Sequence, residues 1–374
     1  MIKRKFQFKG NRLLLVLTPL IFRLLKALIR AGSPLPKTPV AQVSVLYVYR
    51  EWGEDTAVIL ATKDSLGRFL GTSPLDCLCL KTMDSIVAIT KTQIGKRSYT
   101  HLVLDWRAMV ASAFWYQIPG LLADCRRLAN TCYENNISVL CQSTDFYDPA
   151  DRIVSSLLTS NGGQVISLAC LPNLRFFPHK RVIGPAPITL PKQATAAPAP
   201  DAPREIPVFF GGSLYQPRKS FFDSLARELE LRRIGFVYSR KSDVKAYEDY
   251  LNILSRSKIV VLTTVVSLDR RLRQLQGKAI EATGMGALLI AQQCDSLDAF
   301  FEPNIDYVPF DGLDQVDHVA NLIEQFLSDN GIRSAIAANA QRKILTYTDS
   351  GGVWSRLDPP IFQKQLEISE MKEK

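Results

Sequence analysis

Short apolar runs alternate with helical segments through the second half of the chain, and this alternation constrains the fold more than any other feature. The runs are rich in β-branched and aromatic residues, and they are Ile206 to Phe210, Ile234 to Tyr238, Lys258 to Leu262, Ala287 to Ala291 and Tyr307 to Phe310. Between them, apolar residues recur with helical spacing, as in Phe222, Leu225, Ala226 and Leu229. Repeated strand–helix units predict a parallel sheet covered by helices on both faces, with a ligand site beyond the carboxyl ends of the strands.

The first half shows the same alternation less regularly. Its strand candidates are Val43 to Tyr49, Ala57 to Ala61, Ile86 to Thr90, His101 to Asp105, Ile137 to Gln142 and Gln164 to Ala169. Its clearest helices are Leu121 to Asn135 and Asp151 to Ser160. The predicted fold is therefore α/β, with two Rossmann-like, doubly wound domains that face each other across a cleft.

A proline-rich stretch separates the two halves. Residues 185–207 hold seven prolines and almost no large apolar residue after Leu190. Such a stretch buries too little apolar surface to fold and favours extended geometry, so we interpret it as a linker. The predicted organisation is a basic segment at 1–38, a first domain at 39–184, the linker at 185–207, a second domain at 208–357 and a polar tail at 358–374.

The net charge of +10 comes from one end of the chain. Residues 1–50 contain ten lysines and arginines and no acidic residue, whereas the other 324 residues carry 36 basic and 36 acidic side chains. Because the body of the protein is electrically balanced, its composition gives no reason to expect a nucleic-acid partner.

The basic segment has an amphipathic pattern. An apolar run occupies residues 13–22, which is well short of the roughly 20 residues that span a bilayer, and no small-residue cleavage site follows it. Four cations fall within roughly 60° of one another on a helical wheel, and they are Arg12, Arg23, Lys26 and Arg30. We therefore expect residues 1–37 to form a helix on an anionic membrane surface, which places the protein at the cytoplasmic face of the cell membrane. The alternatives are an uncleaved signal anchor and a helix packed on the protein's own body.

Two motifs of the second half contain residues suited to a phosphorylated ligand. In the first motif, an apolar run leads into a glycine-rich turn and then a helix, with the residues Gly211, Gly212, Ser213, Tyr215 and Arg218. Glycines let the backbone approach a ligand, amides at a helix start bind anions, and Arg218 supplies positive charge, so a diphosphate fits this pattern. A plain strand-to-helix turn is the alternative.

The second motif is a predicted helix that carries Lys278 and Glu281 one turn apart, followed by Gly284, Met285, Gly286 and a buried strand. The Glu281 carboxylate can accept hydrogen bonds from a ribose diol, while Lys278 can face phosphate. A surface ion pair between these two side chains is the alternative.

Taken in order along the chain, these motifs resemble the nucleotide-sugar-binding half of the GT-B glycosyltransferases, in the branch of spore-maturation and spore-coat glycosyltransferase-like proteins. The resemblance covers Glu205 to about Leu357. Its matching pieces are Gly212-Ser213-x-Tyr215-x-x-Arg218, the helix from Tyr247 to Leu254 with the strand that follows it, Gly277 to Ala282, Gly284 to Leu289, Asp295 to Glu302 and Tyr307 to Asp311.

The resemblance implies a role for each of these site residues. Glu281 binds the ribose of the donor, Arg218 and the amides of Gly211 to Ser213 neutralise its diphosphate, and Gly284 to Gly286 lie near the sugar. The resemblance also implies that side chains and a helix dipole replace a bound metal, and that the nucleotide-diphosphate sugar is the only small-molecule requirement.

One position departs from the family pattern. Many retaining relatives place a second glutamate eight residues before the ribose-binding one, and here that position is Arg273. Either Arg273 contacts phosphate or the acid that contacts the sugar is absent.

The first domain is expected to bind the acceptor and to supply a base if the reaction inverts the sugar's configuration. Asp105 ends one strand candidate, and Asp145 and Asp148 follow another, which is where such folds place functional residues. A helix cap or a turn is the alternative role for each aspartate.

The sequence therefore predicts a metal-independent glycosyltransferase. It moves a sugar from a nucleotide-diphosphate donor to a lipid-linked or cell-surface glycan at the cytoplasmic membrane face. The alternative is a catalytically inactive GT-B-like scaffold that binds nucleotide or glycan in a polysaccharide assembly complex, and Arg273 in place of the acid favours it.

Overall fold

The computed structural model describes residues 43–50, 56–80, 85–109, 118–143, 151, 154–155, 158, 163–167, 182–184, 187–191, 198–239, 247–265 and 273–356. The predicted membrane segment at 1–38 and the polar tail at 358–374 lie outside these ranges. Within the ranges, we find no helix that is both long enough and apolar enough to cross a bilayer.

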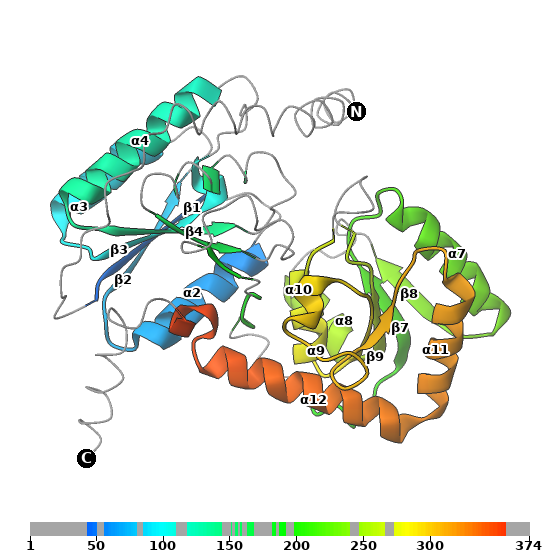
Figure 1. Cartoon of the computed structure of the whole chain (residues 1–374). Coiled ribbons are helices and arrows are strands. Elements are labelled where there is room, and N and C mark those ends of the chain that lie inside the picture. Colours follow the sequence, from blue (N-terminus) through cyan, green and yellow to red (C-terminus); the bar gives the residue numbers. More distant parts are fainter. Residues whose placement is uncertain are drawn as a thin grey trace, which may run out of the picture. The chain divides into compact units, whose positions relative to one another are not determined.

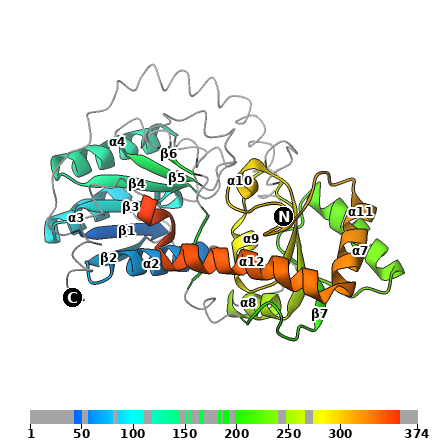
Figure 2. The same ribbon diagram turned by 60° about the horizontal axis from the view of Figure 1, so that its bottom comes forward.

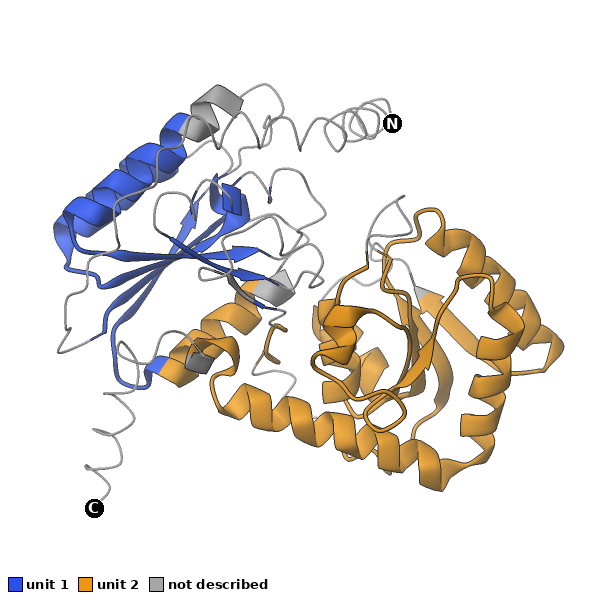
Figure 3. Ribbon diagram, viewed as in Figure 1, with its two compact units in different colours: residues 1–53, 70–184, 356–374 blue, residues 54–69, 185–355 orange. Residues whose placement is uncertain are grey.

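The chain divides into two compact units (Figure 3). Unit 1 comprises residues 1–53, 70–184 and 356–374, and unit 2 comprises residues 54–69 and 185–355. Most of helix α2 (Thr56–Leu70) therefore belongs to unit 2, although the sequence places it in the first domain.

Two side-chain hydrogen bonds attach α2 to unit 2. The hydroxyl of Thr189 donates to the Ala61 carbonyl at 3.2 Å, and the indole of Trp354 donates to the Ser65 hydroxyl at 2.8 Å. The strand candidate Ala57 to Ala61 is wrong, because these residues belong to α2. A short apolar run without alternation does not distinguish a strand from a buried helix.

Unit 1 is built on a six-stranded sheet with the order β2-β1-β3-β4-β5-β6 (Figure 1), and every neighbouring pair is parallel. The strands are β1 (Val45–Arg50), β2 (Leu75–Leu80), β3 (His101–Asp105), β4 (Ser138–Ser143), β5 (Gln164–Ser167) and β6 (Val182–Ile183). The predicted strands at β1, β3, β4 and β5 are confirmed. The predicted helix at Leu121 to Asn135 is also confirmed, as α4 (Ile118–Glu134).

Three elements of unit 1 differ from the prediction, and one of them is the two-residue strand β6, which has no counterpart among the candidates. The strand candidate Ile86 to Thr90 is wrong, because it begins helix α3 (Ile86–Lys96), whose first turn is capped by the Ser85 side chain. Strand β2 has no counterpart among the candidates. It is an edge strand in which Asp76 and the exposed Cys77 and Cys79 interrupt the apolar pattern.

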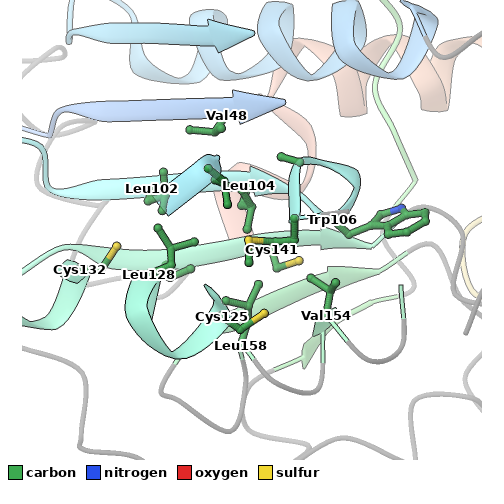
Figure 4. Packing of buried hydrophobic residues seen from close by; sticks show 14 of the residues in the cluster. Val48, Leu102, Leu104, Trp106, Cys125, Leu128, Cys132, Cys141, Val154 and Leu158 are labelled. Carbon is green, nitrogen blue, oxygen red and sulfur yellow. The ribbon is translucent and has the colours of Figure 1, made fainter. Parts of the chain in front are cut away.

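Apolar side chains of the sheet and α4 form the core of unit 1 (Figure 4). Leu102 and Leu104 of β3 lie in this cluster with Leu128 of α4, and with Cys132 and Cys141. Burial raises the pKa of Cys132 to about 12 and raises the pKa of Cys141 well above its ordinary value. These thiols therefore stay protonated at neutral pH and pack as small apolar groups.

Buried His101 makes the stability of unit 1 depend on pH. The side chain is 3% exposed, its Nδ1 lies 2.8 Å from the Thr100 hydroxyl, and burial lowers the pKa of His101 to about 4. The unfolded chain binds the proton near pH 6.5, so stability is full above that pH and falls by up to about 3 kcal/mol as pH drops toward 4. Urea unfolding at pH 7 and pH 4.5 checks this loss, and His101→Gln should show a smaller pH dependence. An equal dependence in both proteins would contradict the assignment.

Unit 2 is built on a five-stranded parallel sheet with the order β11-β10-β9-β7-β8. All five predicted strands are confirmed, and they are β7 (Ile206–Gly211), β8 (Phe236–Ser239), β9 (Ser257–Leu262), β10 (Leu288–Gln292) and β11 (Val308–Phe310). The direction of winding reverses between β7 and β9. This reversal is the topological switch point of a doubly wound domain, beyond which ligands bind.

Helices cover both faces of this sheet (Figures 1 and 2). Helices α7 (Arg218–Leu231) and α11 (Val316–Ser328) lie on one face, and α8 (Tyr247–Ser255) and α9 (Gly277–Gly284) lie on the other. Neighbouring residues of β7 point to opposite faces, since Phe210 stacks on Phe222 of α7 and Phe209 contacts Tyr250 of α8. The long helix α12 (Asn330–Asp349) packs along α9.

The start of the predicted linker is buried against unit 2. Residues 187–191, here called the strap, lie along α9 and α12, with Ile188 and Leu190 in the core. The Tyr347 hydroxyl donates to the Pro187 carbonyl at 2.9 Å, and the Leu190 amide donates to the Thr348 hydroxyl at 3.2 Å. The prediction that this stretch buries little surface is therefore wrong for the strap. Its two large apolar residues are buried, with Ile188 against Gly277 and Leu190 against Gly284.

Gly284→Ala tests how closely the strap packs. A Cβ at Gly284 would lie 2.5 Å from Leu190 Cδ1, whereas a Cβ at Gly95 of α3 would meet nothing within 4 Å. Gly284→Ala is expected to lower the free energy of unfolding by about 1 to 2 kcal/mol, because overpacking outweighs the gain in helix propensity. Gly95→Ala should raise it by up to about 1 kcal/mol. Thermal unfolding measures both, and equal stabilisation by the two substitutions would show that the strap is not held there.

Candidate functional site

The candidate site lies at the switch point of unit 2. Strand β7 ends at Gly211 and leads into Gly212 and Ser213, while neighbouring β9 ends at Leu262 and leads into Thr263 to Val265. The start of α9, with Lys278 and Glu281, lies beside the same loops. The structure therefore brings together most of the residues that the two sequence motifs contain.

Glycine at 211 and 212 allows two side chains to approach the end of β7. Lys278 Nζ donates to the Gly211 carbonyl at 2.6 Å, and a Cβ at Gly212, whose φ is +152°, would collide with that same nitrogen. A Cβ at Gly211 would lie 2.8 Å from the Tyr250 ring. These contacts explain the two glycines more specifically than an ordinary turn does, and they hold a cation over the end of the strand.

Glu281 is a buried carboxylate held by tyrosines. It is 6% exposed, and its Oε1 accepts a hydrogen bond from the Tyr247 hydroxyl at 2.9 Å. Burial and then the Glu281 charge raise the pKa of both Tyr247 and Tyr250, so each hydroxyl keeps its proton and can donate to the carboxylate. The alternative of a surface ion pair with Lys278 does not describe a side chain this deeply buried.

The two tyrosines are site residues that the sequence reasoning missed. Tyr247 and Tyr250 lie three residues apart at the start of α8, which places them on one face of that helix. The sequence placed a helix from Tyr247 to Leu254 without giving its polar aromatic residues a role. Their spacing was the available signal, but nothing in the sequence indicated which carboxylate they face.

Arg218 holds the glycine-rich loop to the end of β9. Its guanidinium donates to the Thr263 hydroxyl at 2.7 Å and to the carbonyls of Val265, Thr263 and Ser213 at 2.8, 3.3 and 3.3 Å. It also lies 4.6 Å from the centre of the Tyr215 ring, whose hydroxyl donates to the same Val265 carbonyl at 2.9 Å. Arg218 and Tyr215 thus position the loop, and direct contact of Arg218 with a diphosphate stays a prediction.

Three further predicted donor-site residues contact protein groups. Arg273 donates to the Gln293 carbonyl at 3.0 Å. Gly284 packs against Leu190 of the strap, and Gly286, with φ of +75°, ends α9 beside the guanidinium of Arg204. The structure gives both glycines packing contacts at the end of α9 remote from Lys278, and their place beside the sugar stays a prediction.

In unit 1, the candidate base Asp105 is buried and bonded to Arg107. It is 1% exposed and accepts hydrogen bonds from the backbone amide, Nε and NH2 of Arg107 at 2.9, 2.8 and 2.6 Å. These bonds support the alternative role of Asp105 as a turn residue after β3, and its role as a base stays a prediction. The other two candidates, Asp145 and Asp148, lie outside the described residues.

A second buried carboxylate, Asp151, accepts hydrogen bonds from Ser143 and Ser155, both at 2.9 Å. The sequence reasoning gave Asp151 no role beyond the start of a helix. Across the described ranges, no three His, Cys, Asp or Glu side chains lie together in a way that could hold a metal ion.

One family match falls within the second unit. Residues 218–354 match the model of a family described as glycosyl transferase-like. The matched stretch contains Arg218, Tyr247, Lys278 and Glu281, and it is similar to glycosyl transferases. No curated protein matches the chain.

Solved structures resemble the whole architecture at low sequence identity. Anabaena Alr3699/HepE in complex with UDP has a TM-score of 0.54 and 11% identity, and the match covers 88% of this chain and 100% of that one. A glycosyltransferase from Rickettsia africae has a TM-score of 0.53 and 11% identity, and the match covers 90% of this chain and 100% of that one. Sucrose-phosphate synthase from Thermosynechococcus elongatus has a TM-score of 0.53 and 14% identity, and the match covers 89% of this chain and 100% of that one. These likenesses show the fold, which is the predicted GT-B class with two doubly wound domains.

Proposed function

We propose that the protein transfers a sugar from a nucleotide-diphosphate donor bound at the switch point of unit 2. The observation that carries this proposal is the buried Glu281, held by Tyr247 and one helical turn from Lys278, inside a glycosyl transferase-like domain. A carboxylate fixed in this way can accept hydrogen bonds from both ribose hydroxyls, since an ionised carboxylate has about four acceptor sites.

Charge at the leaving group is the second part of the proposed mechanism. Lys278 donates to the Gly211 carbonyl at the end of β7, and we assign Lys278, the amides of Gly211 to Ser213 and the start of α9 to the diphosphate. A departing nucleoside diphosphate gains negative charge as the glycosidic bond breaks, and these groups stabilise it without a metal. Chelation with EDTA should therefore leave transfer unchanged.

The first donor to test is a UDP-sugar. Anabaena Alr3699/HepE, which has the same fold, has been solved with UDP and with UDP-glucose. Calorimetric titration and thermal shift with UDP, UDP-glucose and the corresponding GDP, ADP and CMP compounds test the proposal. Binding of one of them, with a rise in unfolding temperature that follows the logarithm of its concentration, supports it. Failure of all of them to bind at millimolar concentration overturns it.

For the acceptor, we propose a lipid-linked or cell-surface glycan. The support is the cationic, amphipathic pattern of residues 1–37, which suits the inner face of the cell membrane. Sedimentation with vesicles tests this. The full chain should pellet with phosphatidylglycerol vesicles and not with phosphatidylcholine vesicles. Replacing Arg12, Arg23, Lys26 and Arg30 by glutamine should abolish pelleting.

A second candidate function is a nucleotide-binding scaffold without turnover. The engagement of Asp105 by Arg107 favours it, because the best-placed candidate base of unit 1 is taken up structurally. Asp145 and Asp148 are then the remaining candidates for the base. Slow hydrolysis of a bound donor, lost in Asp145→Asn or Asp148→Asn, favours the enzyme, whereas tight binding with no hydrolysis and no transfer favours the scaffold.

A further inference from the structure

One arginine remote from the nucleotide joins the two helices that carry Tyr247 and Glu281. We propose that Arg204 is a positioning residue for the donor site: its guanidinium fixes the end of α8 against the end of α9, and so fixes Tyr247 against Glu281. The inference rests on the proposed function, because the residues that Arg204 positions are those assigned to the donor.

Each arm of the guanidinium serves a different helix. NH1 donates to the Ser255 carbonyl at 2.8 Å and to the Leu254 carbonyl at 3.5 Å, which are the last carbonyls of α8, and also to Ser257 of β9 at 3.2 Å. NH2 donates to the Met285 carbonyl, at the end of α9, at 3.0 Å and to the Ala199 carbonyl at 3.3 Å. A single planar group therefore spans two helix ends.

Both helix ends favour a cation. The last four carbonyls of a helix have no partner within the helix, and the helix dipole makes that end negative. Arg204 is 9% exposed, and in the described part of the chain no carboxylate pairs with it, so carbonyl oxygens surround its charge. Only a rigid fork with donors on two sides bonds both helix ends at once, and a lysine has one donor atom.

The geometry connects these ends to the site. Eight residues of α8 separate Ser255 from Tyr247, about 12 Å along the axis, and four residues of α9 separate Met285 from Glu281, about 6 Å. Helices of this length move as rigid rods. If the end of α8 moves relative to the end of α9, Tyr247 therefore moves relative to Glu281. Their hydrogen bond of 2.9 Å weakens when it lengthens by a few tenths of an ångström.

Arg333 of α12 provides a control matched in burial. Burial and then the positive charge of Arg333 lower the pKa of Arg204, so Arg333→Met removes a repulsion and leaves the hydrogen bonds of Arg204 in place. Arg333 is also 9% exposed and also donates to the end of a helix, since its NH1 lies 2.8 Å from the Phe326 carbonyl of α11. Helix α11 covers the other face of the sheet and carries none of the site residues named above. Loss of either arginine is expected to lower the unfolding temperature, but only loss of Arg204 should change the donor site.

Binding of UDP and UDP-glucose, measured by calorimetry, separates the two roles. Arg204→Met is expected to raise the dissociation constant about tenfold and Arg333→Met to leave it within twofold. Arg204→Lys, which keeps the charge, should recover unfolding temperature but not affinity. Equal effects of Arg204→Met and Arg333→Met on affinity would overturn the proposal, as would full recovery of affinity in Arg204→Lys.

A double-substitution experiment with Tyr247 tests whether Arg204 acts on binding through the Tyr247–Glu281 hydrogen bond. If Arg204 acts through the Tyr247–Glu281 bond, Arg204→Met should weaken binding little further in a Tyr247→Phe background. Independent, multiplied effects of the two substitutions would mean that Arg204 is a general structural residue, and the proposal would fail.

Amide hydrogen exchange, measured without nucleotide, tests the positioning role of Arg204 separately from the proposed donor binding. Arg204→Met should accelerate amide exchange in residues 247–255 and 277–286, and Arg333→Met should not. If the parent protein binds none of the nucleotides tested, the donor function fails while this exchange pattern still decides whether Arg204 positions the two helices. Unchanged exchange in both segments would overturn the positioning role whatever the ligand.

Discussion

Replacing Asp105 by alanine is expected to lower the free energy of unfolding by about 4 kcal/mol. The reason is the environment of Arg107, which donates two side-chain hydrogen bonds to the Asp105 carboxylate while both side chains are at most 4% exposed. Losing the carboxylate removes the ion pair and both side-chain hydrogen bonds that it accepts from the buried guanidinium. Urea unfolding of the parent and variant proteins measures the difference.

Two matched variants interpret that loss. Asp124→Ala removes an exposed carboxylate that lies 3.9 Å from Arg127 on α4, and it should change stability by less than about 0.5 kcal/mol. Asp105→Ala combined with Arg107→Met removes both buried charges and should recover part of the loss. If Asp105→Ala lowers the free energy of unfolding by less than about 1 kcal/mol, Asp105 and Arg107 do not form a buried ion pair.

The sequence predicted unit 2 well because its strands are simple. Each of β7, β9 and β10 contains three or four consecutive apolar residues that are buried on both faces of the sheet. Helix α11, which follows the last strand, shows clear helical spacing, since Val319, Ala320, Ile323 and Phe326 are all buried. Local pattern and tertiary environment agree in this unit, so the apolar runs and the helical spacing together identify its elements.

The first half of the chain was predicted less well because local pattern and burial disagree. Thr56–Leu70 begins with a run of apolar residues that favours a strand, yet it forms helix α2, and its Ala61 and Ser65 bond to residues far along the chain. No window of sequence contains those partners. The strap is similar: Leu190 is buried only because Gly284, far along the chain, leaves room for it.

The candidate site was also predicted only in part. Lys278 and Glu281 were predicted from residue type and spacing, and the structure brings them to the loop that follows β7. Tyr247 and Tyr250, the partners of Glu281, were not predicted, because they come from another helix. Arg218 was predicted as a charge for the ligand, but a buried guanidinium has five donors, and here neighbouring carbonyls take most of them.

Glu281→Ala is expected to lower kcat/KM for the donor about a thousandfold. Hydrogen bonds from two ribose hydroxyls to a charged carboxylate contribute about 4 kcal/mol together, and each factor of ten in rate corresponds to about 1.4 kcal/mol. Because the substitution also removes the acceptor of the Tyr247 hydroxyl, unfolding temperature must be measured beside the kinetics. Transfer or donor hydrolysis at saturating acceptor provides the rates.

Glu248→Gln is the control for that loss, since Glu248 is an exposed carboxylate in the first turn of α8, one residue from Tyr247. It should leave both kcat and KM within twofold. Glu281→Gln keeps an acceptor for Tyr247 but loses the charge, so it should fall between the control and Glu281→Ala. If Glu281→Ala retains more than a tenth of the parent kcat/KM while folded, Glu281 does not hold the ribose, and the buried carboxylate serves only to anchor α8 to α9.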